Sequence, residues 1–339
     1  GSVNEAGKDT EFNWGYDPVN YNVPEGSYST DPAHGEVRIR EMKEMIQVLH
    51  SQGFRVIMDV VYNHTYSLDS WFQRTAPWYF YRVFDDGRIS NGSACGNDVA
   101  SEREMCAKYI LESVLYWTEE YHIDGFRFDL MGLMDVDLMN RIRKALDERY
   151  GRGEKLLFGE PWAAAETAME RGAIPALKKN IALLDENIGM FCDDTRDAVK
   201  GSALKIKRPG FINGAAGKEM DIVRSARAWC ASEEDSGRDE EAAAGVRAPS
   251  QIITYVSAHD NQTLWDKLAE TMPEADAAER MRLNRMAAAL YMTCQGTLFL
   301  LSGEEFARTK NGLEDSFNAP IALNRLDWKQ AWENRSLLQ

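Results

Sequence analysis

Cysteine is scarce in this sequence, and the positions of the cysteines argue against a CxxC motif and against a metal site. Five cysteines occur among 339 residues, and none forms a CxxC pair or another spacing that is typical of a metal site. We therefore expect free, mostly buried thiols in a reducing compartment. A recognisable signal peptide is also lacking at the start of the chain. These features favour a cytoplasmic protein, with an extracellular one as the alternative.

Long apolar runs and an excess of positive charge are lacking as well. No segment approaches the roughly 18 consecutive apolar residues that a membrane helix needs. Acidic residues number 54 against 39 lysines and arginines, which gives a formal net charge of -15. An acidic surface repels phosphate backbones, whereas neutral ligands such as sugars carry no such penalty. We therefore predict neither a membrane nor a nucleic acid as a partner.

Two catalytic motifs are absent from the sequence. No GxGxxG follows a predicted strand, so dinucleotide binding has little support. No HExxH or comparable histidine spacing occurs, which disfavours a metal hydrolase. Aromatic residues, by contrast, are plentiful. The 9 Trp, 13 Tyr and 13 Phe supply flat apolar faces of the kind on which sugar rings pack.

The chain alternates between helix-like and strand-like segments. Helical spacing of apolar residues predicts helices, and short apolar, β-branched runs predict strands buried on both faces. The expected helices span 36–52, 102–121, 136–150 and 276–294, and the expected strands span 54–64, 125–130, 155–162, 187–195, 251–261 and 297–305. Before them, residues 1–35 predict one long, aromatic-rich loop. Such alternation indicates an α/β fold with a parallel sheet.

Polar clusters at the strand ends distinguish between the two main parallel architectures. Five predicted strands end in YNH, FDL, GEPW, HDN or GEE. A (β/α)8 barrel carries its site on this face, whereas a doubly wound sheet concentrates function at one switch point. We therefore predict an α/β fold of the (β/α)8 TIM-barrel type across residues 1–339. Within it, residues 213–249 predict an acidic, partly flexible insertion with a solvated surface.

The stretch DGFRFDLMG, residues 124–132, contains an arginine two residues before an aspartate. Side chains alternate along a strand, so Arg127 and Asp129 should point to the same face. An adjacent guanidinium keeps a carboxylate ionised, which suits a nucleophile or a charge stabiliser better than a proton donor. The alternative is a buried core ion pair, which would add little stability by itself.

A second carboxyl group, Glu160, follows an apolar strand in LLFGEPW and stands near Trp162. A carboxyl group among apolar and aromatic side chains tends to have a raised pKa, so it can hold a proton near neutral pH and act as a general acid. His259 and Asp260 end another predicted strand, and His64 ends the strand at 54–64. Glycoside hydrolysis uses such a set, because one carboxylic acid protonates the leaving oxygen while a carboxylate attacks or stabilises the cationic sugar.

Four motifs, DVVYNH, GFRFD, GEPW and VSAHDN, resemble in this order the four short signature regions of the α-amylase superfamily, glycoside hydrolase family 13. FNWGYDPVNYNVPEGSYS, residues 12–29, resembles the segment that marks type I pullulanases, the α-1,6 debranching members. EDSFNAPIALNRLDW, near the end of the chain, also resembles their pattern. The resemblance covers nearly the whole chain. It implies retaining hydrolysis of α-1,6-glucosidic branch links in pullulan, glycogen or amylopectin-type dextrins.

The resemblance also implies roles for individual residues. Asp129 would be the nucleophile, Glu160 the acid/base, and Asp260 the third carboxylate, which grips the sugar hydroxyls. The implied substrate-binding residues are Tyr16, His64, Arg127, Trp162 and His259. Tyr16 would stack on the ring at the cleaved residue, and Trp162 would border the leaving-group side. No cofactor is implied; some relatives bind calcium at the asparagine matching Asn63, but no oxygen-rich ligand loop is recognisable here and no ion is predicted.

The chain departs from the family pattern at both ends. In the family, two barrel strands precede the NWGYDP segment, and a last helix and a C-terminal β domain follow. We therefore expect a partial barrel here, with the missing strands supplied by the rest of a longer natural chain. Three interpretations stay open: a debranching hydrolase, an α-1,4 amylase-type or transglycosylating relative, and a non-catalytic glucan-binding fragment.

Overall fold

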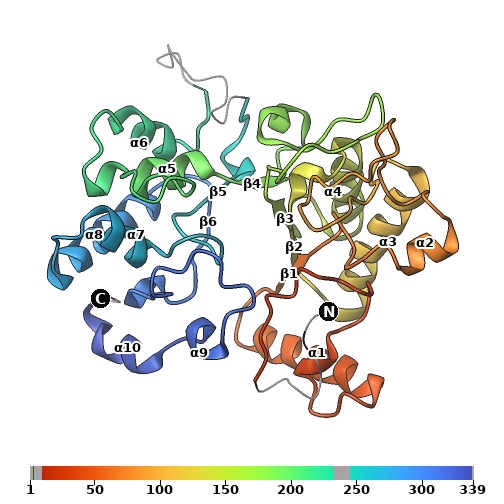
Figure 1. Cartoon of the computed structure of the whole chain (residues 1–339), viewed down its shortest axis with the longest axis horizontal. Coiled ribbons are helices and arrows are strands. Elements are labelled where there is room, and N and C mark those ends of the chain that lie inside the picture. Colours follow the sequence, from red (N-terminus) through yellow and green to blue (C-terminus); the bar gives the residue numbers. More distant parts are fainter. Residues whose placement is uncertain (1–2, 4–9, 232–244, 338–339) are drawn as a thin grey trace. The chain divides into compact units, whose positions relative to one another are not determined.

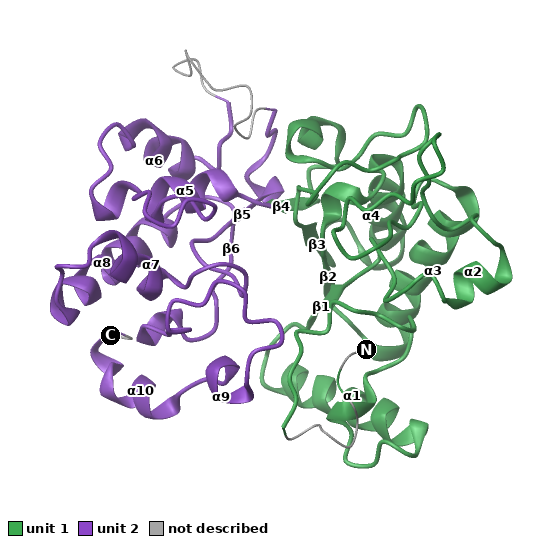
Figure 2. Cartoon of the chain, viewed as in Figure 1, with its two compact units in different colours: residues 1–190 green, residues 191–339 purple. Residues whose placement is uncertain are grey.

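The computed structural model describes residues 3, 10–231 and 245–337 of the chain. The chain divides into two compact units, residues 1–190 and 191–339, which Figure 2 colours separately. Each unit combines helices with parallel strands, so the chain is a partial α/β domain of the predicted class. Among the described residues, no helix combines the length and the apolar character that crossing a membrane requires.

The strands of unit 1 follow one another in chain order as parallel neighbours. They are β1 (Ile57–Val60), β2 (Gly125–Phe128), β3 (Leu156–Gly159) and β4 (Gly189–Phe191), whose last residue begins unit 2. In this register Asp59 pairs with Arg127, and Phe128 pairs with Gly159. The residues that follow β2 and β3, Asp129 and Glu160, therefore emerge at the same end of neighbouring strands.

Several helices belong to unit 1. They are α1 (Gly35–Ser51), α2 (Trp71–Thr75), α3 (Glu104–Tyr121) and α4 (Val136–Tyr150), with short 3-10 turns η2 (Gly26–Tyr28), η3 (Met131–Leu133) and η4 (Lys178–Leu183). Figure 1 shows α3 and α4 on the same side of β1–β3. The buried face of α3 carries Ile110, Val114 and Trp117, which recur at helical spacing. Their burial explains why the apolar pattern predicted this helix correctly.

Unit 2 packs short helices around one parallel strand pair, β5 (Ile252–Thr254) and β6 (Thr297–Leu298). Its helices are α5 (Asp193–Lys200), α6 (Glu219–Ala226), α7 (Leu264–Thr271), α8 (Ala277–Tyr291), α9 (Ile321–Asn324) and α10 (Trp328–Glu333), and its 3-10 turns are η5 (Phe211–Asn213), η6 (Pro249–Gln251), η7 (Glu304–Phe306) and η8 (Arg335–Leu337). A hydrophobic core joins α5, α7 and α8 through Val199, Leu264, Leu268, Leu283 and Ala287.

Two expectations about individual segments can be compared with the structure. All five cysteines are free, as predicted, but only Cys106 and Cys192 are buried and Cys95 is exposed. The predicted insertion at 213–249 contains α6, and the indole N–H of Trp229 donates to Thr195 Oγ1 over 2.9 Å. Residues 232–244, which hold most of its acidic run, lie outside the described residues.

Candidate active site

Arg127 lies at the centre of a carboxylate cluster in unit 1. It is 7% exposed, and its Nη1 lies 2.7 Å from Asp59 Oδ1 and 3.2 Å from Asp129 Oδ1. Its Nη2 lies 2.6 Å from Glu160 Oε1. The contact with Asp129 confirms that the two side chains share one face of the strand. The contacts with Asp59 and Glu160 come from β1 and the end of β3, the strands on either side of β2.

The surroundings predicted for Glu160 are wrong in one respect. The residue is 4% exposed, as expected of a buried acid, but its nearest cation is Arg127. Its other oxygen, Oε2, accepts the N–H of Leu130 over 2.8 Å. A buried guanidinium and a backbone N–H favour the ionised carboxylate, whereas purely apolar surroundings would favour the protonated acid. From the sequence, Arg127 was predicted to pair with Asp129 alone, because the sequence does not show which strands are neighbours in the sheet.

Asp129 is held by a residue to which the sequence analysis gave no role. Asn63 Nδ2 donates to Asp129 Oδ2 and to the carbonyl of Asp129, both over 2.8 Å. The backbone N–H of Asp129 donates to Val60 O over 3.0 Å, which continues the pairing of β2 with β1 beyond its last residue. Asn63 and Arg127 together fix the carboxylate, whose side chain is 12% exposed. The position of Asn63 in the polar cluster YNH, at the end of a predicted strand, was the signal in the sequence that could have indicated this role.

Tyr16 reaches the same cluster from the long N-terminal loop. Its hydroxyl donates to Asp59 Oδ2 over 2.6 Å and accepts from Arg127 Nη1 over 3.1 Å. Its ring centroid lies 5.4 Å from the guanidinium carbon of Arg127. Burial raises the pKa of Tyr16, so the hydroxyl stays protonated at neutral pH. The structure thus brings Tyr16 to the predicted site, while its stacking on a sugar ring stays a prediction.

His64 is a buried residue that contacts both Tyr16 and Asn63. The residue is 2% exposed, with Nε2 2.9 Å from the carbonyl oxygen of Tyr16 and Nδ1 2.5 Å from Asn63 Oδ1. Burial lowers the pKa of His64, which favours the neutral imidazole. In the described structure His64 therefore holds the loop of Tyr16 and the side chain of Asn63. Its direct contact with substrate stays a prediction.

The remaining predicted residues are Trp162, His259 and Asp260. Trp162 belongs to unit 1, two residues after Glu160, and its backbone packs against Gly132. His259 and Asp260 belong to unit 2, where His259 Nε2 lies 3.7 Å from Asp260 Oδ2. Lys310 Nζ donates to the carbonyl of His259 over 2.7 Å, which anchors this segment. The approach of Asp260 to Asp129 and Glu160 stays a prediction.

The described residues contain no candidate metal site. Within 10–231 and 245–337, no group of three or more His, Cys, Asp or Glu side chains is arranged so that it could hold a metal ion. The carboxylates of the cluster instead face Arg127, which already supplies the local positive charge. The arrangement is therefore one of paired carboxyl groups on a single cation, which suits acid/base and nucleophilic chemistry at one centre.

Comparison with known sequences finds pullulanases and, at 26% identity, a chloroplastic isoamylase of Oryza sativa, although no protein-family model matches the chain. A pullulanase of Bacillus subtilis (strain 168) is 42% identical over 333 residues, which are 95% of this chain and 44% of that protein. The chloroplastic pullulanase 1 of Arabidopsis thaliana is 33% identical over 379 residues, covering 98% of this chain and 39% of that protein. The chain therefore spans less than half the length of these relatives.

Solved structures of pullulanases resemble the structure of this chain over nearly its whole length. A mutant pullulanase from Paenibacillus barengoltzii complexed with maltotetraose superposes with a TM-score of 0.91 at 45% identity, over 99% of this chain and 51% of that one. Type I pullulanase from Bacillus subtilis complexed with maltose also reaches a TM-score of 0.91, at 38% identity over 100% of this chain and 46% of that one. These similarities agree with a partial catalytic domain.

Proposed function

We propose, from the homology of this chain to the pullulanases over 95% of its length, that it forms part of a retaining glycoside hydrolase that cleaves α-1,6-glucosidic branch links. The observation that carries this proposal is the binding of Asp129 and Glu160 to one guanidinium at the ends of neighbouring strands. Retaining hydrolysis requires two carboxyl groups on opposite sides of the same glycosidic bond.

In the proposed reaction, Glu160 first takes up a proton from solvent, against the preference of Arg127 and the Leu130 N–H for its ionised form, and then gives that proton to the leaving glycosidic oxygen. The carboxylate of Asp129 attacks the anomeric carbon, so a glycosyl ester forms as the glycosidic bond breaks. Glu160, now a carboxylate, removes a proton from water, and that water cleaves the ester. Arg127 stabilises both carboxylate forms, and Asn63 orients Asp129. Asp260 would contribute the third carboxylate, and the reaction would need no cofactor.

The proposed substrate is an α-glucan such as pullulan, glycogen or an amylopectin-type dextrin. Support comes from the relatives, whose structures were solved with maltotetraose and maltose, and from Tyr16, an aromatic residue within the cluster. Tyr16, His64, Trp162 and His259 would bind the glucan. A cytoplasmic location is proposed as well, supported by five free thiols.

Replacing Asp129 with asparagine in the full natural chain tests this proposal. We expect pullulan turnover to fall by at least about 10³-fold, because the amide cannot form the glycosyl ester. The far-ultraviolet circular dichroism should match that of the wild type. Asp86→Asn is the matched control, since Asp86 forms a surface pair with Arg88 and the variant should keep full turnover.

The products formed by the wild type decide between linkages. Maltotriose from pullulan supports α-1,6 cleavage, whereas panose would identify an α-1,4 enzyme. Wild-type turnover in the Asp129→Asn variant would contradict the assignment of the nucleophile. A full-length protein that binds glucan without cleaving it would favour the non-catalytic alternative.

A further inference from the structure

One tight turn, residues 130–133, joins the two candidate reactive carboxylates. Leu130 directly follows Asp129, and its backbone N–H donates to Glu160 Oε2 over 2.8 Å. The N–H of Gly132 donates to the carbonyl of Glu160, also over 2.8 Å. The turn therefore holds Glu160 through both its side chain and its main chain. Any displacement of the turn would change the position of Glu160 relative to Asp129.

The conformation of this turn is unfavourable by itself. Leu130 has φ 41° and ψ 49°, in the left-handed region that residues with a Cβ rarely adopt. Strained backbone of this kind persists only where the surrounding structure determines it, and it is concentrated at functional sites. The side chains that follow, Met131 and Leu133, are completely buried. Polar contacts at the far end of the turn supply a second constraint.

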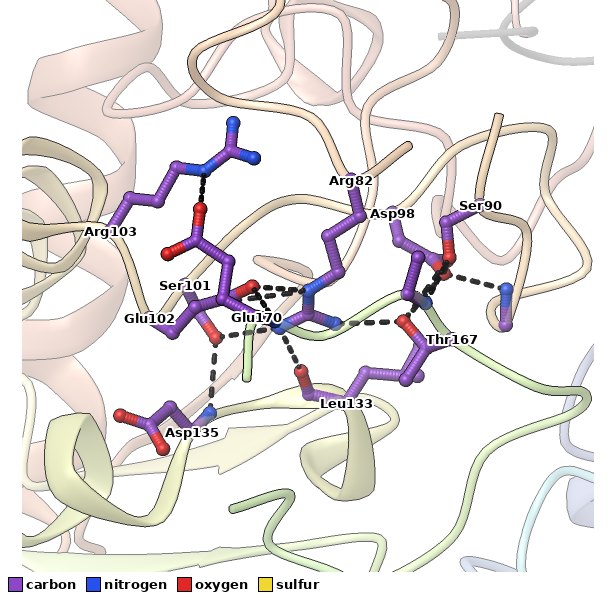
Figure 3. A network of polar contacts seen from close by, with 12 residues as sticks. Arg82, Ser90, Asp98, Ser101, Glu102, Arg103, Leu133, Asp135, Thr167 and Glu170 are labelled. Atoms are coloured by element: carbon purple, nitrogen blue, oxygen red, sulfur yellow. Dashed lines mark hydrogen bonds and ion pairs between the residues drawn. The ribbon is translucent and has the colours of Figure 1, made fainter. Parts of the chain in front are cut away.

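Arg82 supplies that constraint (Figure 3). It is completely buried, and its Nη2 donates to the carbonyl of Leu133 over 3.0 Å. Its Nη1 donates to Thr167 Oγ1 over 3.0 Å, seven residues beyond Glu160. Glu102 balances the charge, with Oε2 2.7 Å from Arg82 Nη2 and a side chain that is 3% exposed. One guanidinium thus connects the end of the turn with the segment that follows Glu160.

The neighbours of Arg82 reinforce both connections. Ser101 Oγ accepts from Arg82 Nη2 and from the N–H of Asp135, just after the turn. Thr167 Oγ1 donates to Asp98 Oδ2 over 2.8 Å, and the N–H of Glu170 donates to Glu102 Oε1 over 3.1 Å. A buried ion pair is a weak source of stability, and its best-supported benefit is a defined geometry. The planar fork of arginine suits this role, because it donates in several fixed directions.

We propose that Arg82 is a positioning residue: by holding Leu133 and Thr167, it fixes the turn that keeps Glu160 beside Asp129. The inference rests on the proposed function, in which these two carboxyl groups react with one glycosidic bond. Arg82 reaches neither carboxylate itself and acts through the backbone. Its effect should therefore appear in the chemical step and in the ionisation of Glu160, with little effect on the binding of glucan.

The substitution Arg82→Lys tests this role in the full natural chain. Lysine keeps the charge for Glu102 but loses the fork that reaches both Leu133 and Thr167. We expect kcat on pullulan to fall about 10- to 100-fold, since small misplacements of reacting groups cost rates of this order. KM should stay within about threefold. The basic limb of the pH–kcat profile should move to higher pH, because a loosened Leu130 N–H no longer favours the ionised carboxylate of Glu160.

Arg143→Lys is the matched control. Arg143 is an equally buried arginine of unit 1, paired with Asp147, and it donates to the carbonyl of Lys155 over 2.6 Å at the start of β3, the end opposite Glu160. This variant should lose comparable stability but keep the wild-type kcat and pH profile. Thr167→Val, which removes one acceptor of Arg82, should give a smaller fall in kcat and serves if Arg82→Lys does not fold.

The outcomes separate the inference from the proposed function. If the wild type cleaves pullulan but folded Arg82→Lys and Thr167→Val keep its kcat and pH profile, Arg82 is not a positioning residue. Equal kinetic losses in Arg82→Lys and Arg143→Lys would show that the effect comes from a general loss of stability, which would also contradict a positioning role for Arg82. A wild type that leaves all branched glucans intact overturns the proposed function, and the inference fails with it.

Discussion

At the scale of single residues, the cluster depends on one buried cation that serves three acids. Asp59, Asp129 and Glu160 would repel one another without Arg127, whose side chain is 8% exposed. Burial by itself would lower the pKa of Arg127, but the charges of Glu160 and Asp59 raise it, so the guanidinium stays charged. Removing it would leave the carboxylates of Asp129 and Glu160, whose side chains are 12% and 6% exposed, without a cation in surroundings that water reaches poorly.

The substitution Arg127→Met should therefore destabilise the protein at pH 7. We expect a loss of about 3 kcal/mol in the free energy of unfolding, the low end of the range for breaking a buried ion pair. The loss should shrink as the pH falls, since protonation neutralises the stranded carboxyl groups. Urea unfolding curves at pH 5 and pH 7 measure both effects. Arg88→Met, which breaks a surface pair with Asp86, is the control, and an equal loss in both variants would contradict the prediction.

The sequence predicted some of these residue contacts and not others, for a physical reason. Arg127 and Asp129 stand two residues apart on one strand, so alternation alone places them on one face. The contacts of Tyr16 with Asp59 and of Arg82 with Thr167 join positions 43 and 85 residues apart. Local periodicity carries no information about such pairs, because they arise from strand register and loop packing. The family motifs contain Tyr16 and Asp59, whereas Arg82 and Thr167 lie outside them, and only the folded structure shows which residues these four contact.

At the scale of elements, the predicted strands occur in the right places but are shorter. The strand expected at 54–64 is Ile57–Val60, and the strand expected at 297–305 is only Thr297–Leu298. After β1 the chain leaves the ladder and Asn63 turns into the cluster, whereas Asp129 keeps one backbone hydrogen bond to Val60 while its side chain enters the cluster. The short helices α5, α6 and α7 were not predicted, since eight residues give too few turns for a clear apolar pattern.

Close packing of the turn η3 against the segment after β3 leads to a prediction at this scale. A Cβ at Gly132 would lie 2.4 Å from the carbonyl oxygen of Trp162 and 2.6 Å from its carbonyl carbon. Backbone atoms cannot move aside as a flexible side chain can. Gly132→Ala should therefore lower the free energy of unfolding by about 1–3 kcal/mol and should also reduce kcat, because Glu160 and Trp162 are displaced together.

Thermal unfolding and pullulan kinetics measure these two effects. Gly35→Ala is the matched control, because Gly35 opens α1 and, apart from its chain neighbours and the backbone of its own helix, no atom lies within 4 Å of its added Cβ. That variant should be unchanged or stabilised by about 0.5 kcal/mol, since alanine restricts the unfolded chain. A folded Gly132→Ala protein with the stability and kcat of the wild type would contradict the prediction, because the close contact between Gly132 and Trp162 would then constrain neither stability nor catalysis.

At the scale of the whole molecule, the chain is a partial domain whose two units carry different parts of the proposed chemistry. Unit 1 holds Arg127, Asp129 and Glu160, and unit 2 holds His259 and Asp260. Alternation of helices and strands was enough to predict the α/β class, because each element buries its own apolar pattern. The spatial relation of distant strand ends depends on how the chain closes, which no local pattern encodes.

Unit 2 also contains a buried lysine that links its stability to pH. Lys200, at the end of α5, is 2% exposed, and its Nζ donates to the carbonyl of Gln262 over 2.9 Å. Burial, together with the charges of nearby Arg196 and Lys267, lowers the pKa of Lys200 to about 7, although Glu304 and Asp197 oppose this shift. In the unfolded chain its pKa would be near the ordinary 10.5. The unfolded state therefore binds more protons than the folded state between these two values.

It follows that stability from this residue rises as the pH increases above 7. The free energy of unfolding should gain up to about 1.4 kcal/mol per pH unit from Lys200 between pH 7 and pH 9. Lys200→Met removes the buried charge, so the variant should be more stable than the wild type at pH 7, and this advantage should shrink by up to about 1.4 kcal/mol per pH unit towards pH 9. Urea unfolding curves at pH 7, 8 and 9 measure the difference between the two proteins. Lys207→Met, at an exposed position, should follow the wild-type slope, and a Lys200→Met slope equal to that of the wild type would mean that Lys200 keeps its ordinary pKa in the folded protein.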